Sequence, residues 1–123
     1  MEKICISSSL RFKETIRDTV QRFTEIGIDA LFPNLDTEFQ KGKFDIDVLR
    51  GLCQDHFTAI NAAEGLYVIN PGGYIGTLVT VEIGYALGRE KPVYFTEPTG
   101  HLDHDVLFNG IIPLDKIETF HSL

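Results

Sequence analysis

The sequence is poor in several residue types, and each shortage excludes a class of protein. Its 123 residues include no tryptophan, one methionine and two cysteines. Cys5 and Cys53 lie far apart in the chain, which does not suit a disulfide framework, so we expect free thiols in a reducing cytosol. No apolar run approaches the ~18 residues of a membrane span, and residues 1–10 lack the pattern of a secretion signal. We therefore predict a cytoplasmic protein without a membrane segment.

Basic residues are also scarce, with 11 Lys and Arg against 18 Asp and Glu, and the net charge is −7. A nucleic-acid surface needs a basic stripe, so the charge argues against a nucleic-acid partner. It leaves room for a small anionic ligand held by local donors. The hydrophobic fraction of 43% and the charged fraction of 24% are those of a globular protein. The length then predicts one domain over residues 1–123.

The hydrophobic pattern alternates between short apolar runs and amphipathic stretches. The predicted strands are Lys3–Ser7, 28–32, 65–70, 91–96 and a short fifth at about 117–120. The predicted helices are 10–26, 45–63 and 77–88, with Gly27 closing the first and with loops at 36–44 and 98–110. This alternation predicts a Rossmann-like α/β fold, an open and mostly parallel five-stranded sheet with helices on both faces.

Two predicted loops lie where such a sheet binds its ligands, beyond the carboxyl ends of the strands. The loop after the first strand has three serines and an arginine, whose hydroxyl, N–H and guanidinium groups suit a phosphate or a sugar. The loop after the third strand has glycines that let backbone approach a ligand, and Thr77 is the predicted cap of the next helix. The candidate binding residues are Ser7, Ser8, Ser9, Arg11, Asn70, Gly72, Gly73, Gly76 and Thr77, together with Tyr85 of the helix that follows.

Glu82 is the least expected side chain of the third helix, because its neighbours are apolar or carry only hydroxyls. Helical side chains lean toward the N-terminus, which brings this carboxylate toward the glycine loop. A surface position is the alternative. In an apolar pocket the charged form needs hydrogen bonds, for which Tyr85 and the serine hydroxyls are candidates. On the second helix, Asp55 and His56 are candidate proton donors, or else solvated side chains of a helix face.

Three other features of the sequence are given no part in catalysis. Gly84 and Gly88 share one helix face and predict close backbone packing against a strand, a helix or another subunit. Segment 101–105 has two histidines and two aspartates, but its spacing does not specify a metal geometry, and we expect no metal. The sequence has neither a Walker lysine nor a G-x-G-x-x-G fingerprint, so we expect no nucleotide cofactor.

A family resemblance rests on Ser9-Leu10-Arg11, Gly76-Thr77, Lys91-Pro92-Val93 and, above all, Glu82-Ile83-Gly84-Tyr85-Ala86-Leu87-Gly88. On these residues, most of the chain resembles the nucleoside 2-deoxyribosyltransferase-like superfamily. The resemblance implies a flavodoxin-like five-stranded domain. It also implies an enzyme that cleaves or transfers the N-glycosidic bond of a (deoxy)nucleoside or its monophosphate, without a metal.

The same resemblance implies roles for individual residues. Glu82 matches the nucleophile, and Ser9 and Arg11 match positions that hold phosphate and sugar. Asp55 or His56 matches the acid on the second helix that contacts the nucleoside, and the turn 70–77 matches a loop with sugar and base contacts. The resemblance also implies a homo-oligomer in which a neighbouring subunit completes the site.

Two alternatives stay open. The loop Pro71-Gly72-Gly73 with Gly76-Thr77 is similar to that of the cytokinin-activating phosphoribohydrolases of the lysine decarboxylase-like type, which also cleave an N-glycosidic bond. In addition, no aspartate lies between Asn70 and Glu82 to grip a base. Its absence favours a nucleotide-binding module without turnover.

Overall fold

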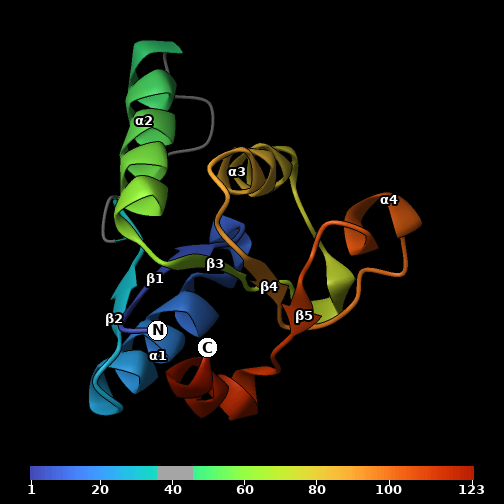
Figure 1. The fold of residues 1–123 in the computed structure, drawn as a ribbon. Helices are drawn as coiled ribbons and strands as arrows, with labels where there is room; N and C mark the ends of the chain where they lie inside the picture. The colour runs from blue at the N-terminus through green and yellow to red at the C-terminus, as the bar shows by residue number, and fades with distance from the viewer. Residues whose placement is uncertain (36–45) are drawn as a thin grey trace.

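The computed structural model describes residues 1–35 and 46–123, in which short strands alternate with helices (Figure 1). The strands are β1 (Lys3–Ser7), β2 (Asp29–Leu31), β3 (Gly65–Val68), β4 (Val93–Phe95) and β5 (Gly110–Ile111). The α-helices are α1 (Lys13–Glu25), α2 (Ile46–Ala62), α3 (Thr77–Gly88) and α4 (Leu102–Asp105). The 3-10 helices are η1 (Leu10–Phe12), η2 (Pro71–Gly73) and η3 (Leu114–Ser122). In this part of the chain no helix is long and apolar enough to cross a membrane.

All strand pairs of the sheet are parallel, and the strand order is β2-β1-β3-β4-β5. Ile4 of β1 lies opposite Ala30 of β2 on one side and Gly65 of β3 on the other. The chain builds outward from β1 to β2, returns, and then continues from β3 to β5 in the other direction. The order therefore reverses between β1 and β3, which is the switch point of a doubly wound sheet. The predicted open α/β sheet is confirmed.

Helices cover both faces of the sheet (Figure 1), with α1 and η3 on one face and α2 and α3 on the other. Alternate strand residues point to opposite faces. Ile4 and Tyr67 pack with α1 and η3, whereas Cys5 and Leu66 pack with α2 and α3. This double cover explains why the central strands are apolar at nearly every position.

Helix α1 begins and ends close to the predicted bounds. Its first predicted turn is instead η1, where the Ser9 hydroxyl accepts a hydrogen bond from the Arg11 N–H at 3.4 Å. Its end is the predicted one, since Gly27 has a φ of 78° and the Ile28 N–H bonds to the Phe23 carbonyl at 2.9 Å. A left-handed glycine after the last turn is a common helix terminator.

The prediction for the last strand was wrong. Strand β5 is Gly110–Ile111, and residues 117–120 belong to η3. Ile117 and Phe120 are three positions apart and both buried, because this spacing puts them on one side of a 3-10 turn. The Phe120 ring centroid lies 4.9 Å from that of Tyr67 and 5.6 Å from that of Phe23. The predicted loop 98–110 also contains the short helix α4.

Three further predictions concern α2 and α3. The N-cap of α3 is Gly76 and not Thr77, because Gly76 is extended and Thr77 is already helical. Gly84 and Gly88 are exposed, and no described atom outside the helix backbone lies within 4 Å of a Cβ built on either. The predicted packing of these glycines against a strand or helix of this chain is therefore wrong for the described residues. Residue 45 and the predicted loop 36–44 lie outside them.

Candidate functional site

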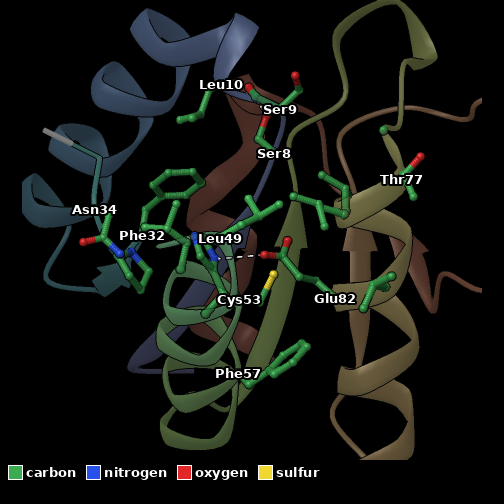
Figure 2. A pocket seen from close by; sticks show the side chains of 17 residues that line it. Ser8, Ser9, Leu10, Phe32, Asn34, Leu49, Cys53, Phe57, Thr77 and Glu82 are labelled. Atoms are coloured by element: carbon green, nitrogen blue, oxygen red, sulfur yellow. Dashed lines mark hydrogen bonds and ion pairs between the residues drawn. The ribbon is translucent and has the colours of Figure 1, made fainter. Parts of the chain in front are cut away.

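A cavity of about 380 Å³ lies between α2 and α3, beyond the carboxyl ends of β1 and β2 (Figure 2). This volume is within the range of small-molecule sites. The segment after β1 contributes Ser8, Ser9 and Leu10, at the switch point of the sheet. Most of the lining is apolar, and the largest apolar side chains are Leu10, Phe32, Leu49, Leu52, Phe57 and Leu78.

Glu82 places a carboxylate in the wall of this cavity. Val79, Ile83 and Ala86 of α3 face the sheet, and Glu82 projects beside them toward α2, with only 12% of its side chain exposed. The hydroxyl of Ser7, the last residue of β1, donates a hydrogen bond to Oε2 of Glu82. Burial raises the pKa of Glu82 to about 7, although the bond from Ser7 acts in the opposite direction. The carboxyl group therefore exchanges its proton near neutral pH.

His56 of α2 approaches Glu82 from the opposite wall. Its Nδ1 lies 3.1 Å from Oε1 of Glu82 (Figure 2, dashed line), and its side chain is 14% exposed. The contact is not an aligned hydrogen bond, because Nδ1 is buried without a hydrogen-bond partner in the described residues. Burial lowers the pKa of His56, while the Asp55 charge and a hydrogen bond to the Pro33 backbone raise it. The ring also packs edge-on against Phe32 at 5.0 Å.

Both cysteines lie near this carboxylate, and both are free thiols as predicted. Cys5 of β1 is fully buried, and burial together with the Glu82 charge raises the pKa of its thiol to about 12. It therefore stays protonated and packs as an apolar residue. Cys53 of α2 lines the cavity.

The serine-rich loop has a divided role. Ser7 holds Glu82, and the Ser8 hydroxyl donates to the Ile69 carbonyl at 2.7 Å, which ties the loop to the end of β3. Ser9 lines the cavity at the start of η1. The guanidinium of Arg11 lies over the ring of Tyr74, 3.8 Å from its centroid, and is not part of the lining.

The glycine loop reaches the cavity only at its end, through Gly76 and Thr77. Gly72 and Gly73 have φ values of 68° and 80° and form the turn itself, outside the lining. The Asn70 side chain is fully buried and joins β3 to the end of β4. Its Oδ1 accepts from the Thr96 hydroxyl at 2.7 Å, and its Nδ2 donates to the Glu97 carbonyl at 2.8 Å.

Two other candidates also lie outside the lining. Asp55 is exposed, and its carboxylate accepts a hydrogen bond from Asn34 at 2.9 Å. The Tyr85 ring stacks on Phe57 at 4.3 Å, and its hydroxyl accepts a bond from Asn61 at 2.8 Å. The structure thus brings together Ser7, Ser8, Ser9, His56, Gly76, Thr77 and Glu82 around one cavity.

The apolar wall of the cavity was not among the predicted site residues. It is lined by Phe32, Leu49, Leu52, Cys53 and Phe57. The available signal was the apolar stripe of α2. Only its C-terminal part, at Ala59 and Ile60, is buried against the sheet, while Leu49 is still 37% exposed.

Asp105 ties segment 101–105 to the two residues that precede it. The backbone N–H groups of Thr99 and Gly100 donate to the Asp105 carboxylate at 2.9 and 3.1 Å, which lowers its pKa. His104 Nε2 lies 3.1 Å from the Thr80 hydroxyl. Over residues 1–35 and 46–123, no group of three His, Cys, Asp or Glu side chains is placed to hold a metal ion.

Comparison with known proteins gives matches at the level of structure. No family model and no curated protein matches the sequence. A 2-deoxyribosyltransferase from Bacillus psychrosaccharolyticus superposes with a TM-score of 0.66, over 94% of this chain and 90% of that chain. The chain has the fold of a 2-deoxyribosyltransferase. A conserved protein from Enterococcus faecalis V583 shares this fold with a TM-score of 0.64, over 98% of this chain and 99% of that one. Each is 16% identical to this chain, so the 2-deoxyribosyltransferase likeness concerns the fold.

Proposed function

We propose that this protein cleaves or transfers the N-glycosidic bond of a (deoxy)nucleoside or nucleoside monophosphate, with Glu82 as nucleophile. One observation carries the proposal: a buried carboxylate projects into a cavity of nucleoside size, at the switch point of the sheet, and a serine hydroxyl holds it. The 2-deoxyribosyltransferase fold supports the same reaction class.

In the proposed reaction, a Glu82 oxygen attacks C1′ of the sugar while the bond from C1′ to the base breaks. The electron pair of that bond leaves with the base nitrogen, through an oxocarbenium-like transition state. Water or a second base then releases the sugar from the glycosyl-enzyme. The nucleophile must be ionised, and a pKa of about 7 leaves a large ionised fraction near neutral pH. The Ser7 hydroxyl fixes the orientation of the carboxylate.

The lining supports separate places for the parts of such a substrate. The base packs against the apolar wall formed by Phe32, Leu49 and Leu52. The sugar and any phosphate lie near Ser9, Thr77 and the unbonded N–H groups of the first turn of α3, which favour negative charge. Arg11 follows Leu10 of the lining and is our candidate for an added phosphate contact. The leaving base takes its proton from His56, since Asp55 does not line the cavity.

The direct test is base release from a panel of 2′-deoxynucleosides and their 5′-monophosphates, followed by liquid chromatography with and without an acceptor base. We expect Glu82→Gln to lower release by at least about 10³-fold, because it removes the nucleophile and leaves the shape of the side chain. Asp103→Asn, an exposed carboxylate of α4, is the matched control and should retain the wild-type rate. A 2-fluoro sugar analogue should leave a covalent adduct on Glu82, detected by mass spectrometry. Wild-type release by Glu82→Gln would contradict the proposal, and ligand binding without release would favour a binding module.

We also propose that the protein forms a homo-oligomer through the outer face of α3. Leu78 and Val81 are each 49% exposed there, and the exposed Gly84 and Gly88 continue the same face. A helix face without charged side chains and with two glycines allows the backbone of another helix to come close. Leu78 and Val81 also line the cavity, so a second copy at this face would border the site.

A further inference from the structure

The contact between His56 and Glu82 brings a buried ring nitrogen close to a carboxylate oxygen, and a hydrogen bond between these two atoms needs a proton. Nδ1 of His56 is buried, lies 3.1 Å from Oε1 of Glu82 and has no hydrogen-bond partner in the described residues. In a neutral imidazole one ring nitrogen carries a hydrogen and the other, as an acceptor, has a lone pair. Nδ1 is the ring nitrogen that lies next to Glu82.

Without a proton on either group, an ionised Glu82 oxygen and an Nδ1 lone pair are two acceptors 3.1 Å apart. They repel each other, and Nδ1 is buried away from solvent. One proton between them removes the conflict, either on Oε1 or on Nδ1. We propose that Glu82 and His56 hold one proton between them, and that Glu82 becomes the attacking carboxylate by passing this proton to Nδ1 of His56.

Among the described residues around the pair, no other group supplies a positive charge to the Glu82 carboxylate, so we assign that charge to the proton passed to His56. On the side of β1, Ser7 bonds to the other Glu82 oxygen, and the thiol of Cys5 stays neutral. On α2, Cys53 lines the cavity and the exposed Asp55 favours a charged His56. The segment after β2 contributes the neutral Phe32, Pro33 and Asn34, and no Lys or Arg of the described residues lines the cavity. A protonated His56 is thus the cation that stabilises the Glu82 carboxylate.

Resting on the proposed function, the proton completes a balanced cycle. Transfer to Nδ1 frees Glu82 to bond to C1′, and the electron pair of the broken bond goes to the base nitrogen. His56 then gives its proton to the leaving base, and the pair has none. When water attacks C1′, the bond to Glu82 breaks, the hydroxyl stays on the sugar, and His56 takes the remaining proton. The pair again holds one proton, and the products are free base and sugar.

The first experiment needs no substrate. Nuclear magnetic resonance of the ¹⁵N-labelled imidazole of His56, followed from pH 4 to pH 9, reports the proton on each ring nitrogen. We expect the Nδ1 signal of the wild type to move in two coupled steps, and in one step in Glu82→Gln, since that variant removes the second titrating group. Asp55→Asn is the control and should keep both steps. A single step at the same pH in the wild type and in Glu82→Gln would overturn the shared proton.

The second experiment tests the donor role with a leaving group that needs no proton. Above pH 7 Glu82 can lose its proton to solvent without His56. There His56→Asn should lose about 10² to 10⁴-fold in kcat/KM on a deoxynucleoside and less than about 10-fold on 4-nitrophenyl 2-deoxyriboside. Its remaining activity should rise with pH, whereas the wild-type profile should be bell-shaped. Equal losses on both substrates would overturn the donor role. If the wild type releases no base while the two coupled steps persist, the proposed function fails and the shared proton stands.

Discussion

Glu82 lowers the stability of the fold in a pH-dependent way. Its pKa is about 7 in the folded protein, against an ordinary value of 4.5, so the folded state binds its proton more tightly than the unfolded state. The free energy of unfolding is therefore highest, as far as Glu82 is concerned, below about pH 4.5, and it falls as pH rises through about 7. The shift corresponds to about 3 kcal/mol between these limits.

Glu82→Gln should remove this dependence, because an amide does not titrate. We expect the variant to gain about 1–3 kcal/mol over the wild type at pH 8 and little at pH 4.5. Urea unfolding at the two pH values measures the difference. Glu118→Gln, which changes an exposed carboxylate, should show no such gain. An equal effect of Glu82→Gln at both pH values would argue against a buried carboxyl group that titrates near 7.

The sequence could indicate which residue types form the site, but less well which of them face the cavity. Glu82 was recognisable because apolar neighbours surround it. Asp55 and His56 are adjacent, and a helical step of about 100° separates their directions. The sequence did not decide between them, whereas the structure places only His56 in the lining. Asn70 sits at the predicted end of its strand, but its amide bonds to Thr96 and Glu97, which are distant in sequence.

At the level of elements, the glycine turn before α3 depends on a conformation that other residues rarely adopt. Gly73 has a φ of 80°, and a Cβ there would lie 3.1 Å from the Pro98 carbonyl oxygen and from Thr99 backbone atoms. Gly73→Ala should destabilise the protein by about 1–3 kcal/mol, since backbone strain and the close contact act together. Gly51→Ala, in the interior of α2 with no described atom near its Cβ position, should instead stabilise by up to about 1 kcal/mol. Thermal unfolding of the two variants compares them, and a loss of stability in both would contradict the argument.

The elements differ in how far the sequence predicts them. Strands β1 and β3 were found within a few residues because each is a short, nearly unbroken apolar run, and helices α1 to α3 because each is a longer stretch between turn residues. Strand β5 has two residues, which is too short to show a hydrophobic periodicity in the sequence. Residues 117 and 120 were assigned to a strand because a four-residue segment with apolar residues only at its two ends fits more than one period. Only the packing of Phe120 against Phe23 and Tyr67 settles the 3-10 form.

For the whole molecule, the exposed face of α3 is the feature with the widest consequence. Gly84 lies on this face, has open space before it and does not line the cavity. Gly84→Glu should place a charge in the proposed contact between subunits and shift the protein to a monomer. The fold itself should persist, because Glu is the better helix former. Light scattering coupled to size-exclusion chromatography measures the mass, and a wild-type monomer would contradict self-association.

The two cysteines differ in how accessible they are to reagents in solvent, so a thiol reagent can modify the cavity at one of them. Cys5 is fully buried, whereas Cys53 lines the cavity beside Glu82. A small alkylating reagent applied to the folded protein should therefore add one label, at Cys53, and intact mass spectrometry counts it. A compound seated between α2 and α3 should slow that labelling in proportion to its occupancy. Footprinting at one natural thiol can thus rank nucleosides and nucleotides as ligands before any turnover is known.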